Sequence, residues 1–222
     1  MSAQLFRFDE SGNALSAPSD VLSPNSTSPQ AIIRWALERS RQPVISTNFR
    51  PHSAALLHLV TQARPDIPVI WVDTGYNTPE TYRYAAALTA RLRLNLQVYT
   101  PRVSAARRSS VMGGVPGLDH PEHGTFTSEV KLEPFERAFR ELQPDLWFTG
   151  IRAEQTSFRK SLGVVSTGVL GTLKVAPLYH WTEVDLENYL YEFGLPDNLD
   201  YVDPTKVSDD RECGLQHLGS GI

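Results

Sequence analysis

Cys213 is the only cysteine in the 222 residues of this sequence. A single cysteine cannot form a disulfide within the chain. Nor can it supply the several thiolates of an iron–sulfur cluster or of a cysteine-rich zinc site. If Cys213 takes part in chemistry, it therefore does so as a thiol. The alternative is an incidental cysteine in a polar tail.

A second candidate is the polar stretch Ser46-Thr47-Asn48-Phe49-Arg50-Pro51-His52-Ser53, which joins a predicted strand to a predicted helix. Free backbone N–H groups at a helix start, together with short hydroxyl side chains, can hold phosphate oxygens. The same residues can also serve only to turn the chain and cap the helix. The spacing alone does not decide between these two interpretations.

Two further segments place polar side chains after predicted strands. Asp73, Thr74 and Gly75 follow one strand, and Asp73 can accept hydrogen bonds from a ribose or an adenine, or can cap the next helix. Residues 151–160 hold Arg152, Arg159 and a lysine, and arginine pairs bidentately with phosphate or sulfate. The alternative for this segment is a solvated loop.

The hydrophobic pattern predicts the elements that position these residues. Strands are expected at residues 44–47, 68–72, 95–100 and 145–150, with a shorter apolar segment at 173–178, and helices at 29–41, 52–63, 79–92, 133–142 and 182–193. Such alternation favours an α/β fold with a mostly parallel twisted sheet and helices on both faces. Ligands of such sheets lie beyond the carboxyl ends of the strands, where the polar segments fall.

We expect three regions along the chain. Residues 1–28 are predicted to be a loosely ordered leader, 29–194 the α/β domain, and 195–222 a mobile tail that carries Cys213. The glycine- and proline-rich residues 109–128 are predicted to form a mobile loop near the site.

Composition excludes several classes of function. The formal net charge of -4 gives no overall attraction to nucleic acid or to a membrane surface. No apolar run approaches the ~20 residues that span a bilayer, and the first residues lack the pattern of a secretory signal. We therefore predict a cytoplasmic protein with no membrane or nucleic-acid partner.

Several motifs in the same order resemble the phosphoadenylyl-sulfate (PAPS) reductase family. They are ISTNFRPHSAALLHL, RPDIPVIWVDTGYNTPETY, KLEPFERAF, WFTGIRAEQTSFRKSL, KVAPLYHW and RECGL, and together they extend from Val44 to Leu215. The resemblance implies an adenine-nucleotide alpha-hydrolase-like fold, also called a PP-loop fold.

The resemblance also implies roles for individual residues. Cys213 falls on the family's reactive cysteine, and Arg211 beside it can lower the thiol pKa from its usual ~8.5. Sulfonucleotide binding is implied for Ser46, Thr47, Asn48, Phe49, Asp73, Thr74, Gly75, Lys131, Arg152, Gln155, Arg159 and Arg211.

The implied reaction reduces 3'-phosphoadenylyl sulfate to sulfite and adenosine 3',5'-bisphosphate through a thiosulfonate on Cys213. Thioredoxin or glutaredoxin then supplies the electrons from outside, because the chain has no second cysteine. Family members that act on adenylyl sulfate usually carry extra cysteines for an iron–sulfur cluster, so the resemblance is to the cluster-free type, with no bound cofactor. A homodimer is expected from the family alone.

The sequence departs from the family pattern in three places. Arg50 replaces a glycine, and it either strains the backbone or adds a cation to the anion site. Gln216 replaces the histidine after the Glu-Cys-Gly-Leu motif, with His217 one position later. The tail lacks a Gly-Tyr and Ser-Ile-Gly-Asp-like stretch, so some substrate contacts have no counterpart. His120 and His123 have no further metal-ligand partners nearby, and we predict no metal.

Two other functions compete with reduction. An ATP-dependent PP-loop sulfurtransferase or ligase would use Cys213 to carry sulfur, although the loop here lacks the glycine pair of the SGGxDS form. A nucleotide-binding regulator without turnover would retain the pocket alone.

Overall fold

The predicted alternation of strands and helices is present in the computed structural model, which describes residues 7–8, 14–15, 23, 25–117 and 119–205. The strands of the main sheet are β3 (Pro43–Thr47), β4 (Pro68–Val72), β5 (Asn95–Tyr99), β6 (Leu146–Phe148), β7 (Val165–Thr167) and β8 (Leu173–Val175). The helices are α1 (Pro29–Leu37), α2 (Ser53–Ala63), α3 (Pro79–Leu92), α4 (Ala105–Met112), α5 (His123–Thr127), α6 (Glu133–Leu142), α7 (Ser157–Lys160) and α8 (Glu183–Glu192). Two short strands, β1 (Arg7–Phe8) and β2 (Ala14–Leu15), pair separately.

The main sheet has the order β5-β4-β3-β6-β8-β7 and is parallel except for β7, which runs antiparallel to β8. From β3 the chain first builds outward through β4 and β5, and it then returns to place β6 on the other side of β3. The gap between β3 and β6 is therefore a topological switch point, where the loops after the two strands diverge.

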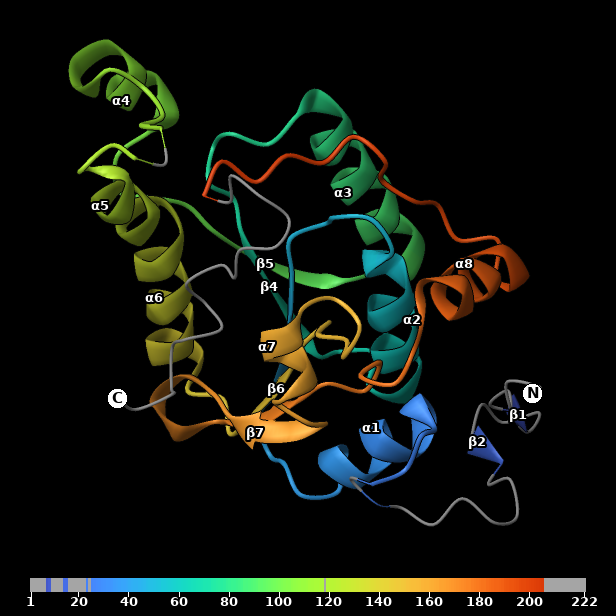
Figure 1. Ribbon diagram of the computed structural model, residues 1–222. Coiled ribbons are helices and arrows are strands. Elements are labelled where there is room, and N and C mark those ends of the chain that lie inside the picture. The colour runs from blue at the N-terminus through green and yellow to red at the C-terminus, as the bar shows by residue number, and fades with distance from the viewer. Residues whose placement is uncertain (1–6, 9–13, 16–22, 24, 118, 206–222) are drawn as a thin grey trace.

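Helices cover both faces of the sheet. Figure 1 shows α6 on one side and α2 and α3 on the other. Two buried clusters match these faces. The larger joins α1, α2, α3 and α8 to the sheet, and the smaller packs Phe135 and Phe139 of α6 against Trp147. The mostly parallel α/β architecture predicted from the sequence is confirmed.

Local sequence signals set the helix starts. Ser28 and Thr78 accept hydrogen bonds from backbone N–H groups of α1 and α3, and a proline follows each. Thr182 and Asp185 form a capping box at the start of α8. None of the described helices has the length and apolar character that crossing a bilayer demands.

The prediction of a loop at residues 109–128 is wrong at both ends, whereas the described residues between them, 113–117 and 119–122, lie outside helices and strands. The helix α4 extends to Met112, and α5 continues through the π-helix η1 (Ser128–Leu132) into α6. The reason is a tertiary contact. Arg108 is buried, pairs with Glu129 and lies over the ring of Phe126, and so it joins α4 to the helix after the loop.

Candidate active site

A cavity of about 660 Å³ opens at the switch point between β3 and β6. Its polar lining comes from the loop after β3, the loop after β6, η1, the start of α8 and the segment after α8. The charged and polar lining residues are Ser46, Thr47, Asn48, Arg50, His52, Ser53, Lys131, Thr149, Arg152, Gln155, Arg159, Glu183, Tyr201 and Asp203. The volume and position are those of a small-molecule site.

The loop after β3 is held by its own side chains. Thr47 Oγ1 accepts a hydrogen bond from the Phe49 N–H at 3.1 Å, and Asn48 Oδ1 accepts one from the Arg50 N–H at 3.3 Å. Ser46 Oγ accepts one from Trp147 Nε1 at 2.8 Å, which ties β3 to β6. Ser46, Thr47 and Asn48 all line the cavity, as the phosphate-loop hypothesis requires.

Phe49 is buried in the core, unlike its neighbours in the loop, which line the cavity. Its side chain is 0% exposed and its ring meets that of Trp71 edge-on, with centroids 5.0 Å apart. Its φ of 52° is in the left-handed region, and we infer that this burial offsets the backbone strain. Phe49 is absent from the cavity lining, so its side chain anchors the loop in the core.

The backbone conformation at Arg50 decides between the two interpretations of this residue, backbone strain or an added cation. Arg50 is not among the residues with positive φ, so arginine causes no left-handed strain there. Its side chain lines the cavity, and Nη2 donates to the carbonyl oxygen of Gly150 at 3.4 Å. Arg50 therefore adds a cation to the site.

Asp73, Thr74 and Gly75 lie outside the cavity lining. Asp73 Oδ1 accepts hydrogen bonds from the Gly75 N–H, from Asn77 Nδ2 and from the Tyr82 hydroxyl. Burial and the Asp73 carboxylate raise the pKa of Tyr82 to about 12. Asp73 thus organises the turn before α3, and its contact with an adenosine stays a prediction.

Three predicted cations meet at the cavity and are buried: Lys131, Arg152 and Arg159. Gln155 Oε1 accepts from the guanidinium of Arg159 and from the backbone N–H of Arg152 at 3.0 Å, so it orients the Arg159 side chain and fixes the loop after β6. Arg152 also pairs with Glu154. With Arg50, four cationic side chains face one cavity, which is the electrostatic character of an anion site.

Residues 195–205, which we call the strap, supply site residues that sequence reasoning missed. The strap is red in Figure 1, where it leaves α8, passes α3 and ends near α5. Asp197 accepts from the His52 N–H at 2.7 Å, and Asn198 Nδ2 donates to the Phe49 carbonyl oxygen at 2.7 Å. Asn48 Nδ2 donates to the Tyr201 hydroxyl at 2.8 Å. The described part of the predicted tail is therefore packed on the site.

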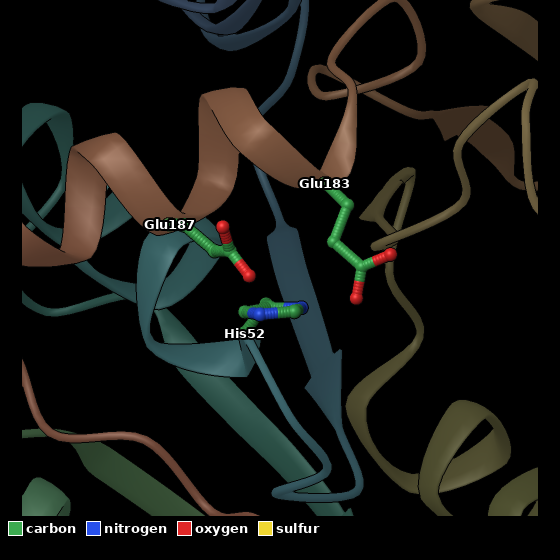
Figure 2. Close-up of side chains that lie close together, drawn as sticks. All are labelled: His52, Glu183 and Glu187. Carbon is green, nitrogen blue, oxygen red and sulfur yellow. The ribbon is translucent and has the colours of Figure 1, made fainter.

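One cluster could offer ligands to a metal. Figure 2 shows the imidazole of His52 between the carboxylates of Glu183 and Glu187, and the potential ligand atoms lie within 4.8 Å of one another. Both glutamates are exposed, and His52 Nε2 is already 3.5 Å from Asp197 Oδ2. His120 and His123 instead make contacts within their own loop, and the prediction of no metal stays a prediction.

Cys213 and Arg211, as well as Gln216 and His217, lie outside the described residues. The last described residue, Thr205, contacts Lys131 at the cavity and precedes Cys213 by eight positions.

A family model and curated relatives match most of this chain. The phosphoadenosine phosphosulfate reductase domain matches residues 42–200. A curated relative from Xanthomonas campestris pv. campestris, named phosphoadenosine 5'-phosphosulfate reductase, is 43% identical over 170 residues, which are 74% of this chain and 68% of the relative.

Solved structures with a similar fold identify the fold of this chain. The PAPS reductase of Candida auris, solved as a phosphate complex, has a TM-score of 0.67 and 25% identity, covering 77% of this chain and 81% of that one. The FMN adenylyltransferase of Candida glabrata, at a TM-score of 0.56 and 15% identity, covers 79% of this chain and 56% of that one and shows the fold alone. These likenesses confirm the predicted PP-loop fold, and the chain belongs to the phosphoadenosine phosphosulfate reductase family.

Proposed function

We propose that this protein reduces 3'-phosphoadenylyl sulfate to sulfite and adenosine 3',5'-bisphosphate, as an enzyme of sulfate assimilation. The observation that carries the proposal is the cavity at the switch point, where Arg50, Lys131, Arg152 and Arg159 gather. Such a site suits a ligand that bears several phosphate and sulfate groups. Membership of the reductase family supports the same substrate class.

The reaction requires a nucleophile, and we assign that role to Cys213. Its thiolate attacks the sulfur of the sulfate group, an S–Sγ bond forms, and the bond from sulfur to the nucleotide phosphate oxygen breaks. The electron pair of the broken bond leaves with adenosine 3',5'-bisphosphate, and a thiosulfonate remains on Cys213. The cavity cations stabilise charge that moves onto the leaving phosphate.

An external dithiol completes the cycle, and we propose thioredoxin or glutaredoxin for this step. One thiolate of the dithiol attacks Cys213 Sγ, sulfite leaves with the bonding electron pair, and a mixed disulfide forms. The second thiol of the partner then displaces Cys213 and the partner becomes oxidised. Two electrons pass from the dithiol to sulfur, so the chain needs no second cysteine.

Chain length is compatible with this role for Cys213. Eight positions separate it from Thr205, which contacts Lys131 at the cavity. An extended chain spans at most about 3.5 Å per residue, so the thiol is within reach of the whole cavity. The cytoplasmic location, the homodimer and the absence of an iron–sulfur cluster stay predictions.

The test is sulfite release from 3'-phosphoadenylyl sulfate with reduced thioredoxin, compared between the wild type and Cys213→Ser. We expect sulfite from the wild type only, and a labelled sulfonate on Cys213 when the dithiol is omitted. No sulfite from the wild type, with either 3'-phosphoadenylyl sulfate or adenylyl sulfate as the substrate, would refute the proposal. ATP-dependent release of pyrophosphate would instead support a ligase, and nucleotide binding without turnover a regulator.

A further inference from the structure

Lys131 is already paired with an anion of the protein itself. Its Nζ contacts Asp203 Oδ2 and donates to Thr205 Oγ1 at 3.0 Å. The Lys131 and Asp203 side chains are each only 7% exposed. Burial opposes ionisation of Asp203, but the charge of Lys131 and hydrogen bonds from Lys131 and Thr205 outweigh it, so the pKa of Asp203 lies below its usual value. Asp203 is therefore a carboxylate at neutral pH.

The Asp203 carboxylate stands inside the cavity. Among its described lining residues only Glu183 and Asp203 are acidic, and Glu183 is exposed. Asp203 thus supplies a buried carboxylate to a cavity whose other buried charged lining residues, Lys131, Arg152 and Arg159, are cationic. A carboxylate and a phosphate or sulfate oxygen compete for the same ammonium donors, because each lysine has only three N–H groups to offer.

The rest of the strap is fixed without Asp203. Asn198 donates to the Phe49 carbonyl and to Thr81 Oγ1, and the Asp200 carbonyl accepts from Thr78 Oγ1 at 2.7 Å. Beyond these anchors, Asp203 Oδ1 accepts from the Thr205 N–H at 3.0 Å and from its hydroxyl at 2.7 Å. Because Lys131 Nζ contacts both Asp203 and Thr205 of this turn, releasing the carboxylate from Lys131 would move the turn at 203–205 and leave the earlier strap in place.

We infer that Asp203 is an internal competitor for the anion subsite at Lys131, and that a substrate anion binds there by displacing the Asp203 carboxylate. The inference rests on the proposed function, since it takes the ligand to be an anionic nucleotide. Displacement opens the 203–205 turn, through which the chain continues toward Cys213. Ligand binding in the cavity therefore moves the turn that precedes the segment carrying Cys213.

A competitor of this kind weakens apparent affinity, because only the fraction of molecules with Lys131 released can bind the ligand there. Asp203→Asn keeps the size of the side chain, removes the competing charge and leaves the buried ammonium without a counter-charge. We expect adenosine 3',5'-bisphosphate to bind this variant at least about fivefold more tightly than the wild type, the lower end of typical coupling between two sites.

The matched control is Asp200→Asn. This is the same chemical change three positions earlier on the strap, at a carboxylate whose neighbour is Glu80 and which is not among the cavity residues. Calorimetric titration with adenosine 3',5'-bisphosphate should give unchanged affinity for this control. Equal or weaker binding by Asp203→Asn would overturn the inference and would make Asp203 a residue that orients Lys131. Absence of binding in the wild type as well would refute the proposed substrate class.

A second measurement needs no variant. Hydrogen exchange at the Thr205 amide, which donates to Asp203 Oδ1, should accelerate when the wild type is saturated with adenosine 3',5'-bisphosphate. The amide of Asp73, which donates to the Tyr99 carbonyl outside the strap, should not accelerate. Slower or unchanged exchange at Thr205 would show that the turn at 203–205 does not open in the complex, against the inference.

Discussion

The loop at 46–53 and the strap at 195–205 line the same cavity but are held by different forces. The loop follows a central strand, and Phe49 fixes it in the hydrophobic core between the rings of Trp71 and Tyr84. The strap is fixed mainly by hydrogen bonds and by the Lys131–Asp203 pair. Hydrophobic burial is strong and insensitive to pH, whereas polar anchors are individually weak and exchange with ligands. We infer that the loop keeps its conformation when a ligand binds, whereas the strap can rearrange.

The largest effect is expected from Phe49→Ala. Truncating a fully buried phenylalanine costs about 3–5 kcal/mol of unfolding free energy, because it leaves a cavity and loses contacts. The measurement is urea denaturation. The control is Tyr191→Ala on α8, where the ring is 90% exposed, and we expect a change within about 0.5 kcal/mol there. A loss at Phe49 no greater than at Tyr191 would show that the loop does not depend on its buried ring.

Acid should weaken the strap before it weakens the loop. The pKa of Asp203 is lowered in the folded protein, because the charge of Lys131 and the hydrogen bonds outweigh burial. The pair therefore stabilises the fold above the ordinary carboxyl pKa of 3.8, and this contribution is lost as the pH falls through the lower folded-state value. The measurement is the difference in unfolding free energy between the wild type and Asp203→Asn, which should shrink below the ordinary pKa. A pH-independent difference would contradict this assignment.

Asn198→Ala removes the amide that joins the strap to the loop. Its Nδ2 donates to the Phe49 carbonyl at 2.7 Å and to Thr81 Oγ1 at 3.0 Å, and the residue is buried. We expect a loss of about 1–3 kcal/mol in unfolding free energy, because the buried partners are left unsatisfied. The control is Asn95→Ala, whose Nδ2 donates to the Asp66 carbonyl at an exposed position. Similar losses of unfolding free energy at both positions would mean that the buried hydrogen bonds of Asn198 stabilise the fold no more than the exposed one of Asn95.

The two regions also differ in how far they can be predicted from sequence. The strand and helix around the loop follow from an apolar run and from helical periodicity, and the polar residues after β3 mark the site. The core position of Phe49 also has a signal, since it is the only aromatic residue in a polar stretch. Its assignment to substrate binding came instead from its place in the family motif.

The strap has no such signal. Its anchors join residues far apart in the sequence, such as Asn48 with Tyr201 and His52 with Asp197, and they involve single polar side chains without periodicity. The same reason explains the helical ends of residues 109–128, where the buried Arg108 side chain pairs with the exposed Glu129 and joins α4 to η1 across the loop. Tertiary polar contacts of this kind are invisible to local pattern analysis.

The contact between Asn48 and Tyr201 provides the smallest and most direct test of the comparison. Asn48 Nδ2 donates to the Tyr201 hydroxyl at 2.8 Å, and this is one of the hydrogen bonds that join the loop to the strap. A double-mutant cycle of Asn48→Ala and Tyr201→Phe, followed by urea denaturation, isolates that bond from the other contacts of each residue. We expect a coupling of about 0.5–1.5 kcal/mol, the usual net value of a single hydrogen bond. Zero coupling would mean that this hydrogen bond does not hold the strap, and that contacts such as those of Asp197, Asn198 and Asp203 do so instead.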